Sequence, residues 1–234
     1  MVPNTEKYRP LYRELLENAL GDEKGRLFPF FCQVGKDYFK NESRILFVGK
    51  SANGWVTDSR NVDILFTQSN ENRIVNRTDQ MEWVDALEGP NPVYNTRKSA
   101  FWRVVKGISS RLLNPGNWYG EIAWTNLFKV SPIEGNPRAI LRRKQLEICR
   151  RIFDLDLINL SPRIVIFLTS GWEIDFLSTD GYEIDRRAFV QWADYKTYYS
   201  HFNNRVIIHS PHPQGKPENQ HIEAICKILV KEIR

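Results

Sequence analysis

The stretch RILFVGKSANGW, residues 44–55, decides the fold class of this protein. Its residues 45–48 are a continuous apolar run of strand length, which is typical of a strand covered on both faces in a parallel sheet. Small and polar residues follow, so we expect the strand to end in a loop. Three later segments repeat this form: EIAWTNLFKVSP (121–132), RIVIFLTSG (163–171) and NRVIIHSPHPQG (204–215).

Helical apolar spacing separates these predicted strands. It occurs at 6–20, 97–113, 138–162 (one helix or a pair), 172–177 and 218–233. The alternation predicts an α/β fold, a three-layer α/β/α sandwich with a mostly parallel central four-stranded sheet. A long polar loop at 56–80 is expected to contain a short strand at DILF (63–66). We predict one domain over 1–234, with an N-terminal helical extension at about 1–40.

Composition limits the possible partners. The 234 residues carry a net charge of +5, and several arginines cluster between 138 and 151, which indicates either a solvated helix face or a surface for a polyanion. No apolar run is long enough to span a membrane, and the N-terminus lacks an apolar signal segment. We therefore expect a cytoplasmic monomer without a membrane partner. Three scattered cysteines predict no disulfide, no metal site and no cofactor.

The letters GKS at 49–51 are similar to the end of a phosphate-binding loop. That loop needs a glycine five residues before the glycine of the GK pair, and this position is Arg44. The residues between are the strand itself, so no glycine-rich arch can surround a phosphate. A nucleophile elbow is absent too, because the TSGW stretch lacks its flanking glycines.

Ligands of open α/β sheets bind beyond the carboxyl ends of the strands, where these four loops should converge. His212 lies there between two prolines, and a neutral imidazole at this place could donate a hydrogen bond to a developing anion. His209, within the strand, could instead face the core. Asn126 interrupts an apolar strand, and its amide suits either the edge of a base or neighbouring backbone.

Taken together, these segments resemble the uracil-DNA glycosylase superfamily over residues 45–229. VGKSANGW is similar to its first motif, and TNLFKVSPIEGNPR to the N-x-x-K-C-x-P-x-x-N-R motif of its iron-sulfur branch. PRIVIFLTSGW matches its third strand, and VIIHSPHPQGK its final HPS-type motif. KSAFWRVV resembles an N-x-FW helix start of the mismatch-specific branch.

The resemblance implies a glycosylase that hydrolyses the N-glycosidic bond of uracil or a related damaged base, single-stranded or flipped from duplex DNA. It assigns base binding to the residues around Asn126, catalysis to His212 and a water-positioning group, and phosphate contacts to lysines. The expected base-binding residues are Gly49, Lys50, Asn126 and Trp55, with Phe66 and Tyr94 as further stacking candidates. The catalytic candidates are His212, Asn53, Ser51 and Asp58, and the phosphate contacts are Lys50, Lys129 and Lys216.

The sequence departs from the family at the water-activating position. Ser51 stands where the first motif has a carboxylate or an amide, and a serine is a poor general base. Asn53 or Asp58 would then position the water. Val130 replaces a cysteine of the iron-sulfur branch, so no cluster is expected. Two alternatives stay open: a non-catalytic nucleic-acid or nucleotide-binding protein on this fold, and a small-molecule hydrolase.

Overall fold

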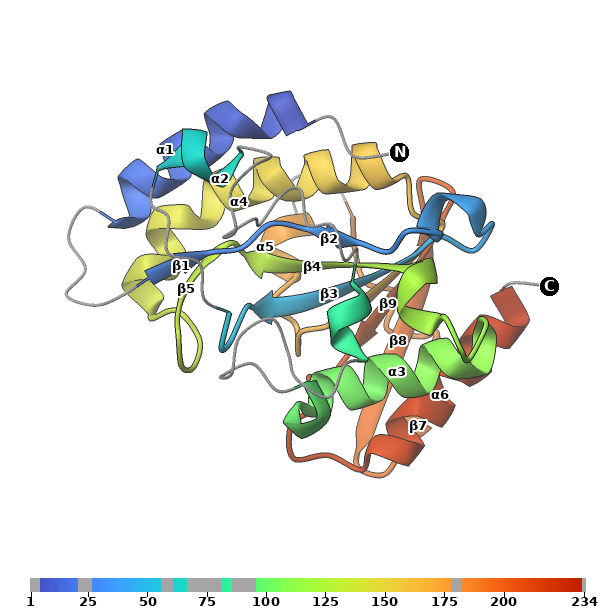
Figure 1. Ribbon diagram of the computed structural model, residues 1–234. Coiled ribbons are helices and arrows are strands. Elements are labelled where there is room, and N and C mark those ends of the chain that lie inside the picture. The colour runs from blue at the N-terminus through green and yellow to red at the C-terminus, as the bar shows by residue number, and fades with distance from the viewer. Residues whose placement is uncertain are drawn as a thin grey trace.

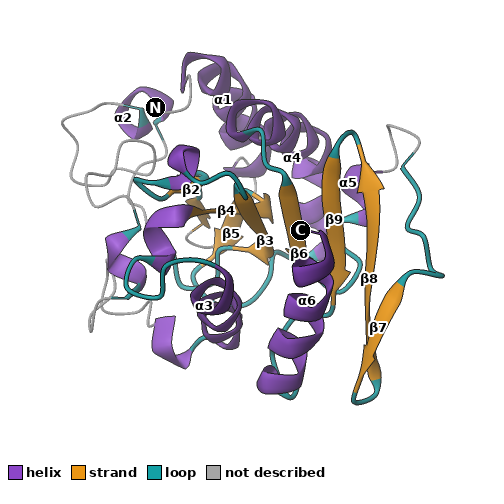
Figure 2. Cartoon of the chain, turned by 90° about the vertical axis from the view of Figure 1, so that its right-hand side faces the viewer, coloured by secondary structure: helices purple, strands orange, loops and turns teal. Residues whose placement is uncertain are grey.

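The computed structural model describes residues 5–20, 27–55, 61–66, 81–85, 96–177 and 182–232. Within these residues a seven-stranded sheet has the order β2-β4-β3-β6-β9-β8-β7 (Figure 1 and Figure 2). Its strands are β2 (Gln33–Val34), β4 (Ile122–Phe128), β3 (Ile45–Ser51), β6 (Ile164–Leu168), β9 (Arg205–Ser210), β8 (Tyr195–Phe202) and β7 (Phe189–Trp192). A separate antiparallel pair joins β1 (Leu27–Pro29) to β5 (Val130–Pro132).

The sheet is mixed, and the expected number of four strands is wrong. Its four inner strands β4, β3, β6 and β9 are parallel and correspond to the four apolar runs. Three antiparallel strands extend them: β2 beside β4, and the pair β7 and β8 beyond β9. Most side chains of β7 and β8 are partly or fully exposed, so these strands lack the continuous apolar run that identifies the inner ones.

Helices pack on both faces of the sheet (Figure 2). α1 (Tyr8–Leu20) and α4 (Ala139–Leu160) contact each other on one face, and α3 (Ala100–Leu112) and α6 (Glu218–Glu232) contact each other on the opposite one. Alternate residues of β3 serve the two faces: Leu46 belongs to the core under α1 and α4, and Phe47 to the core under α3 and α6. The segment 138–162 is thus a single helix, which ends at Ser161 in the left-handed conformation before Pro162.

The remaining elements are short. They are α2 (Val62–Leu65), α5 (Ile174–Leu177) and 3₁₀ turns at Thr5–Lys7, Tyr38–Lys40, Glu82–Val84, Thr96–Lys98 and Trp118–Glu121. The strand expected at 63–66 is wrong, because Asn61 accepts a hydrogen bond from the backbone N–H of Asp63 (2.8 Å) and caps a helical turn. The N-terminal segment contributes β1 and β2 in addition to α1. Along the described residues, no helix is long and apolar enough to cross a membrane.

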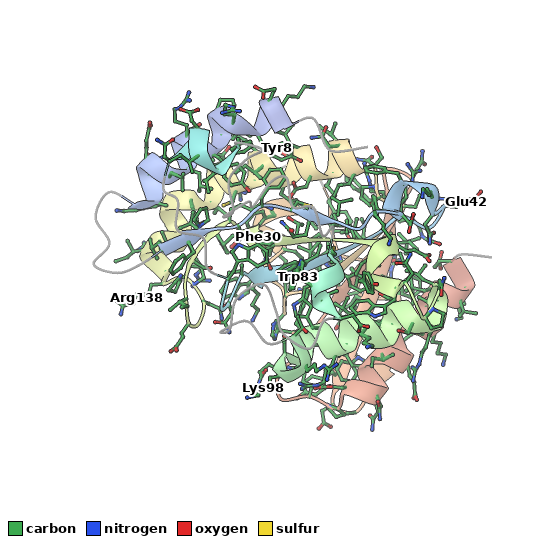
Figure 3. All side chains as sticks on the ribbon, viewed as in Figure 1. Tyr8, Phe30, Glu42, Trp83, Lys98 and Arg138 are labelled. Carbon is green, nitrogen blue, oxygen red and sulfur yellow. The ribbon has the colours of Figure 1, made fainter. Side chains whose placement is uncertain are left out.

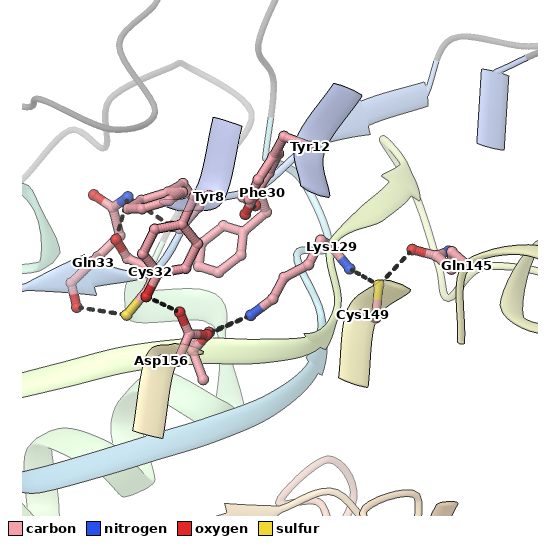
Figure 4. Close-up of polar contacts among 11 residues, drawn as sticks. Tyr8, Tyr12, Phe30, Cys32, Gln33, Lys129, Gln145, Cys149 and Asp156 are labelled. Carbon is pink, nitrogen blue, oxygen red and sulfur yellow. Dashed lines mark hydrogen bonds and ion pairs between the residues drawn. The ribbon is translucent and has the colours of Figure 1, made fainter. Parts of the chain in front are cut away.

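Lys129 is fully buried beside β4, on the face covered by α1 and α4. Its Nζ lies 2.7 Å from Oδ2 of Asp156 on α4 (Figure 4) and 2.6 Å from Oγ1 of Thr125. Tyr8 donates a further hydrogen bond to the same carboxylate (3.0 Å). The expectation that Lys129 contacts DNA phosphates is therefore wrong. Its ammonium group pairs with Asp156 inside the core, where a carboxylate without a cation would lower the stability of the fold.

Lys129→Met should lower the free energy of unfolding by about 3–5 kcal/mol, because it leaves a buried carboxylate without its cation. Urea denaturation measures this. The double variant Lys129→Met/Asp156→Leu should recover part of the loss, since it removes both charges. Arg151→Met, at the half-exposed pair of Arg151 with Glu14 (3.0 Å), is the control and should cost less than about 1 kcal/mol. A stability of Lys129→Met equal to that of the wild type would contradict the assignment.

Candidate functional site

A cavity of about 390 Å³ lies at the carboxyl ends of β3 and β4. It brings together six of the residues that the sequence predicted, from three separate segments of the chain. These are Gly49, Lys50, Ser51, Asn53, Asn126 and His212. Further lining comes from Lys98, Ser99 and Phe101 at the start of α3, from Ile133 and Glu134 after β5, and from Gly54, Trp124 and Gln214. Figure 3 marks Lys98 at this end of α3.

One wall of the cavity is set by the contact between Gly49 and Asn126. The two residues are register partners in the parallel pair of β3 and β4, so a side chain at position 49 would point to the same face as that of Asn126. A Cβ atom at position 49 would lie only 2.3 Å from Oδ1 of Asn126. Glycine at this position is what leaves space for the amide.

The amide of Asn126 is available to a ligand. The residue is 1% exposed, it lines the cavity, and its Nδ2 has no hydrogen-bond partner among the described residues. A buried donor left unsatisfied costs about 1–3 kcal/mol. A bound group with an acceptor atom, such as a carbonyl oxygen, would remove this cost.

The loop at 51–54 is fixed to β5 and to the segment that follows it. Four hydrogen bonds join them: Ser131 Oγ to Ala52 O (3.0 Å), Gly54 N to Ile133 O (2.7 Å), Gly135 N to Asn53 Oδ1 (2.8 Å) and Ser51 Oγ to Asn136 Oδ1 (3.1 Å). The hydroxyl of Ser51 is thus a donor to Asn136, and the side-chain oxygen of Asn53 already accepts a hydrogen bond. The loop is held in one shape by contacts distant in sequence.

Two hydrogen bonds hold His212, one to Ser170 and one within its own turn. Its backbone N–H donates to Oγ of Ser170 (2.8 Å), and its Nδ1 accepts from the backbone N–H of Gln214 (3.3 Å). This geometry assigns the proton of the neutral ring to Nε2. Burial, followed by the positive charges of Lys50 and Lys216, lowers the pKa of His212 to about 4. At neutral pH the ring is therefore an uncharged hydrogen-bond donor.

Phe101 is an aromatic side chain that lines the cavity next to His212, and Trp124 lines it as well. Phe101 is 8% exposed, and its ring is stacked against His212 with centroids 6.5 Å apart. The sequence reasoning missed it as a stacking candidate, although the FW pair at the helix start was a signal. Trp55 and Phe66 are instead buried in the two cores and do not line the cavity, which contradicts their expected stacking role. Tyr94 and Asp58 lie outside the described residues.

Basic side chains gather at one side of the cavity. Nζ of Lys50 lies 4.8 Å from the ring centroid of Trp172, and Cζ of Arg142 lies 4.5 Å from the same centroid. Burial lowers the pKa of Lys50, and so do the positive charges of Lys216 and Arg142. Lys216 is partly exposed and does not line the cavity. This basic cluster of Lys50, Arg142 and Lys216 suits an anionic ligand.

No match to this chain was found among protein-family models or among curated proteins. Over the described residues, no group of three or more histidine, cysteine or acidic side chains is placed to hold a metal ion. The chemistry that the site can perform is therefore inferred from its own residues and their geometry.

His212 should titrate near pH 4 in a ¹⁵N NMR titration, with its proton on Nε2 above that pH. Between pH 6.5 and 4 the unfolded chain binds a proton that the folded chain does not, so His212 contributes stability above pH 6.5 that is lost as the pH falls. Lys50→Met should raise this pKa, since it removes a nearby positive charge. Titration near pH 6.5, or a proton on Nδ1, would contradict the described environment.

Proposed function

We propose that this protein is a base-excision glycosylase acting on DNA, with the three-layer uracil-DNA glycosylase-like architecture that its motifs resemble. More particularly, its substrate is uracil or a related damaged base, removed by hydrolysis of the N-glycosidic bond. The observation that carries the proposal is the convergence of Gly49, Asn126 and His212 on one cavity. These residues come from three motifs of the resemblance.

The cavity has the properties that a flipped base requires. Its volume of about 390 Å³ is in the range of small-molecule pockets. Asn126 offers a buried Nδ2 donor to a base carbonyl, and Phe101 offers an aromatic face beside it. Hydrogen bonds to a base edge together with stacking are the usual means of holding an extruded base.

His212 suits the departure of the base. As the N-glycosidic bond breaks, the sugar becomes cation-like and negative charge develops on the base. A neutral imidazole with its proton on Nε2 can donate a hydrogen bond to that charge. Burial and the nearby lysines keep the ring neutral, so it binds the anion as a fixed dipole.

The basic cluster supports DNA as the partner. Lys216 and Arg142 lie close enough to Lys50 for their positive charges, after burial, to lower its pKa. Phosphates of the strand next to a flipped nucleotide would supply the opposite charge. Binding through these groups would weaken as salt concentration rises.

A second candidate is a protein of this fold that binds nucleic acid without cleaving it. The observation that favours it is Ser51, whose hydroxyl already donates to Asn136 and whose position in the family normally bears a carboxylate or an amide. The two candidates differ in one product: only a glycosylase releases free base.

Purified protein should release free base from oligonucleotides that contain uracil or another deaminated base. His212→Ala should slow single-turnover release about 10²–10³-fold, since it removes one donor to the developing anion. The measurement is alkaline cleavage of the abasic product, together with chromatographic detection of the base. His201→Ala is the matched control, because His201 is exposed on β8 and pairs with Glu232.

Release that is equal in His212→Ala and His201→Ala would contradict the assigned role. Base-dependent binding without any release, over uracil, hypoxanthine, xanthine and mismatched substrates, would favour the non-catalytic candidate.

A further inference from the structure

Glu134 lines the cavity but has no part in the contacts described above. Among the described residues that line the cavity it is the only carboxylate. Its own side chain is exposed, while the backbone on either side is fixed: Ile133 accepts from the N–H of Gly54 (2.7 Å), and Gly135 donates to Asn53 (2.8 Å). The backbone that carries Glu134 is thus fixed to the loop that forms the first motif.

Hydrolysis needs a group that accepts a proton from the attacking water, and the neighbouring side chains are poorly suited to this. Ser51 uses its hydroxyl as a donor to Asn136, and the oxygen of Asn53 already accepts from Gly135. Neither is basic at neutral pH, whereas a carboxylate is an effective acceptor. Since position 51 bears a serine and no carboxylate, an acidic group from another segment can accept the proton of the water instead.

The position of Glu134 also suits the direction of attack. A base that contacts Asn126 and His212 would place its sugar toward the cavity mouth. Water must reach the anomeric carbon C1′ on the side of the sugar away from the departing base. Glu134 is exposed to solvent and lines the same cavity as the buried Asn126 and as His212, so its carboxylate is open to water on the solvent side of a base bound there.

We propose that Glu134 is the general base of this site, an inference that rests on the proposed glycosylase function. The oxygen of water forms a bond to C1′, the bond between C1′ and the base nitrogen breaks, and its electron pair leaves with the base. The water proton passes to the carboxylate of Glu134. The base anion is held by Nε2–H of His212 and later takes a proton from solvent.

Glu134→Gln should reduce single-turnover base release at least about 100-fold, because the amide cannot accept the proton. Affinity for an oligonucleotide with a non-cleavable 2′-fluoro nucleotide should change less than about threefold, since Glu134 is not assigned to binding. Glu134→Ala should regain activity when formate is added, which a merely structural role would not produce. Glu17→Gln, an exposed glutamate of α1, is the matched control.

Each outcome of these measurements supports or overturns the role of Glu134 as the general base. Slow release by Glu134→Gln with unchanged binding, together with rescue by formate, supports the proposal. Release at the wild-type rate by Glu134→Gln overturns it and leaves the glycosylase function intact, and a selective loss in Asp58→Asn would then identify Asp58 as the base. No release by the wild-type protein overturns both proposals, whereas release by the wild-type protein supports the glycosylase function and leaves the Glu134 variants to test the general-base role alone.

Discussion

The parallel pairing of β3 with β4 places Gly49 beside Asn126, and the arrangement of the cavity depends on this contact. Any side chain at position 49 would meet the Asn126 amide at 2.3 Å. The glycine lets a polar group sit at the end of an otherwise apolar strand, buried yet open to the cavity. Phe101 and His212 then approach the same wall from α3 and from the end of β9. The site is thus formed by the ends of β3, β4 and β9, the start of α3 and the segment that follows β5.

The two faces of β4 use polar residues in opposite ways. Asn126 lies on the face toward α3, lines the cavity, and keeps an unsatisfied donor. Lys129, only three residues later, lies in the opposite core and pairs with Asp156. The carboxylate of Asp156 also accepts hydrogen bonds from Tyr8 and Thr125. A ligand can therefore interact with the first residue and cannot reach the second. One face provides stability, and the other provides an accessible polar site.

The inner sheet could be predicted because each buried parallel strand is a continuous apolar run followed by small and polar residues. The same reasoning found Asn126 and His212, since both interrupt or end such runs. It could not find the antiparallel strands β8 and β7 beyond β9, whose exposed residues break the pattern. It also assigned Lys129 to the surface, because its partner Asp156 is 27 residues away on α4 and no local pattern relates them.

The most direct test of the account is a crystal structure of the protein with an oligonucleotide that contains 2′-fluoro-2′-deoxyuridine, which resists cleavage. The account predicts an extruded base in the cavity, with Nδ2 of Asn126 and Nε2 of His212 both within hydrogen-bond distance of it and Phe101 beside its ring. A base that stays stacked in the DNA, or that binds away from Asn126 and His212, would contradict the assignment of this cavity as the base site.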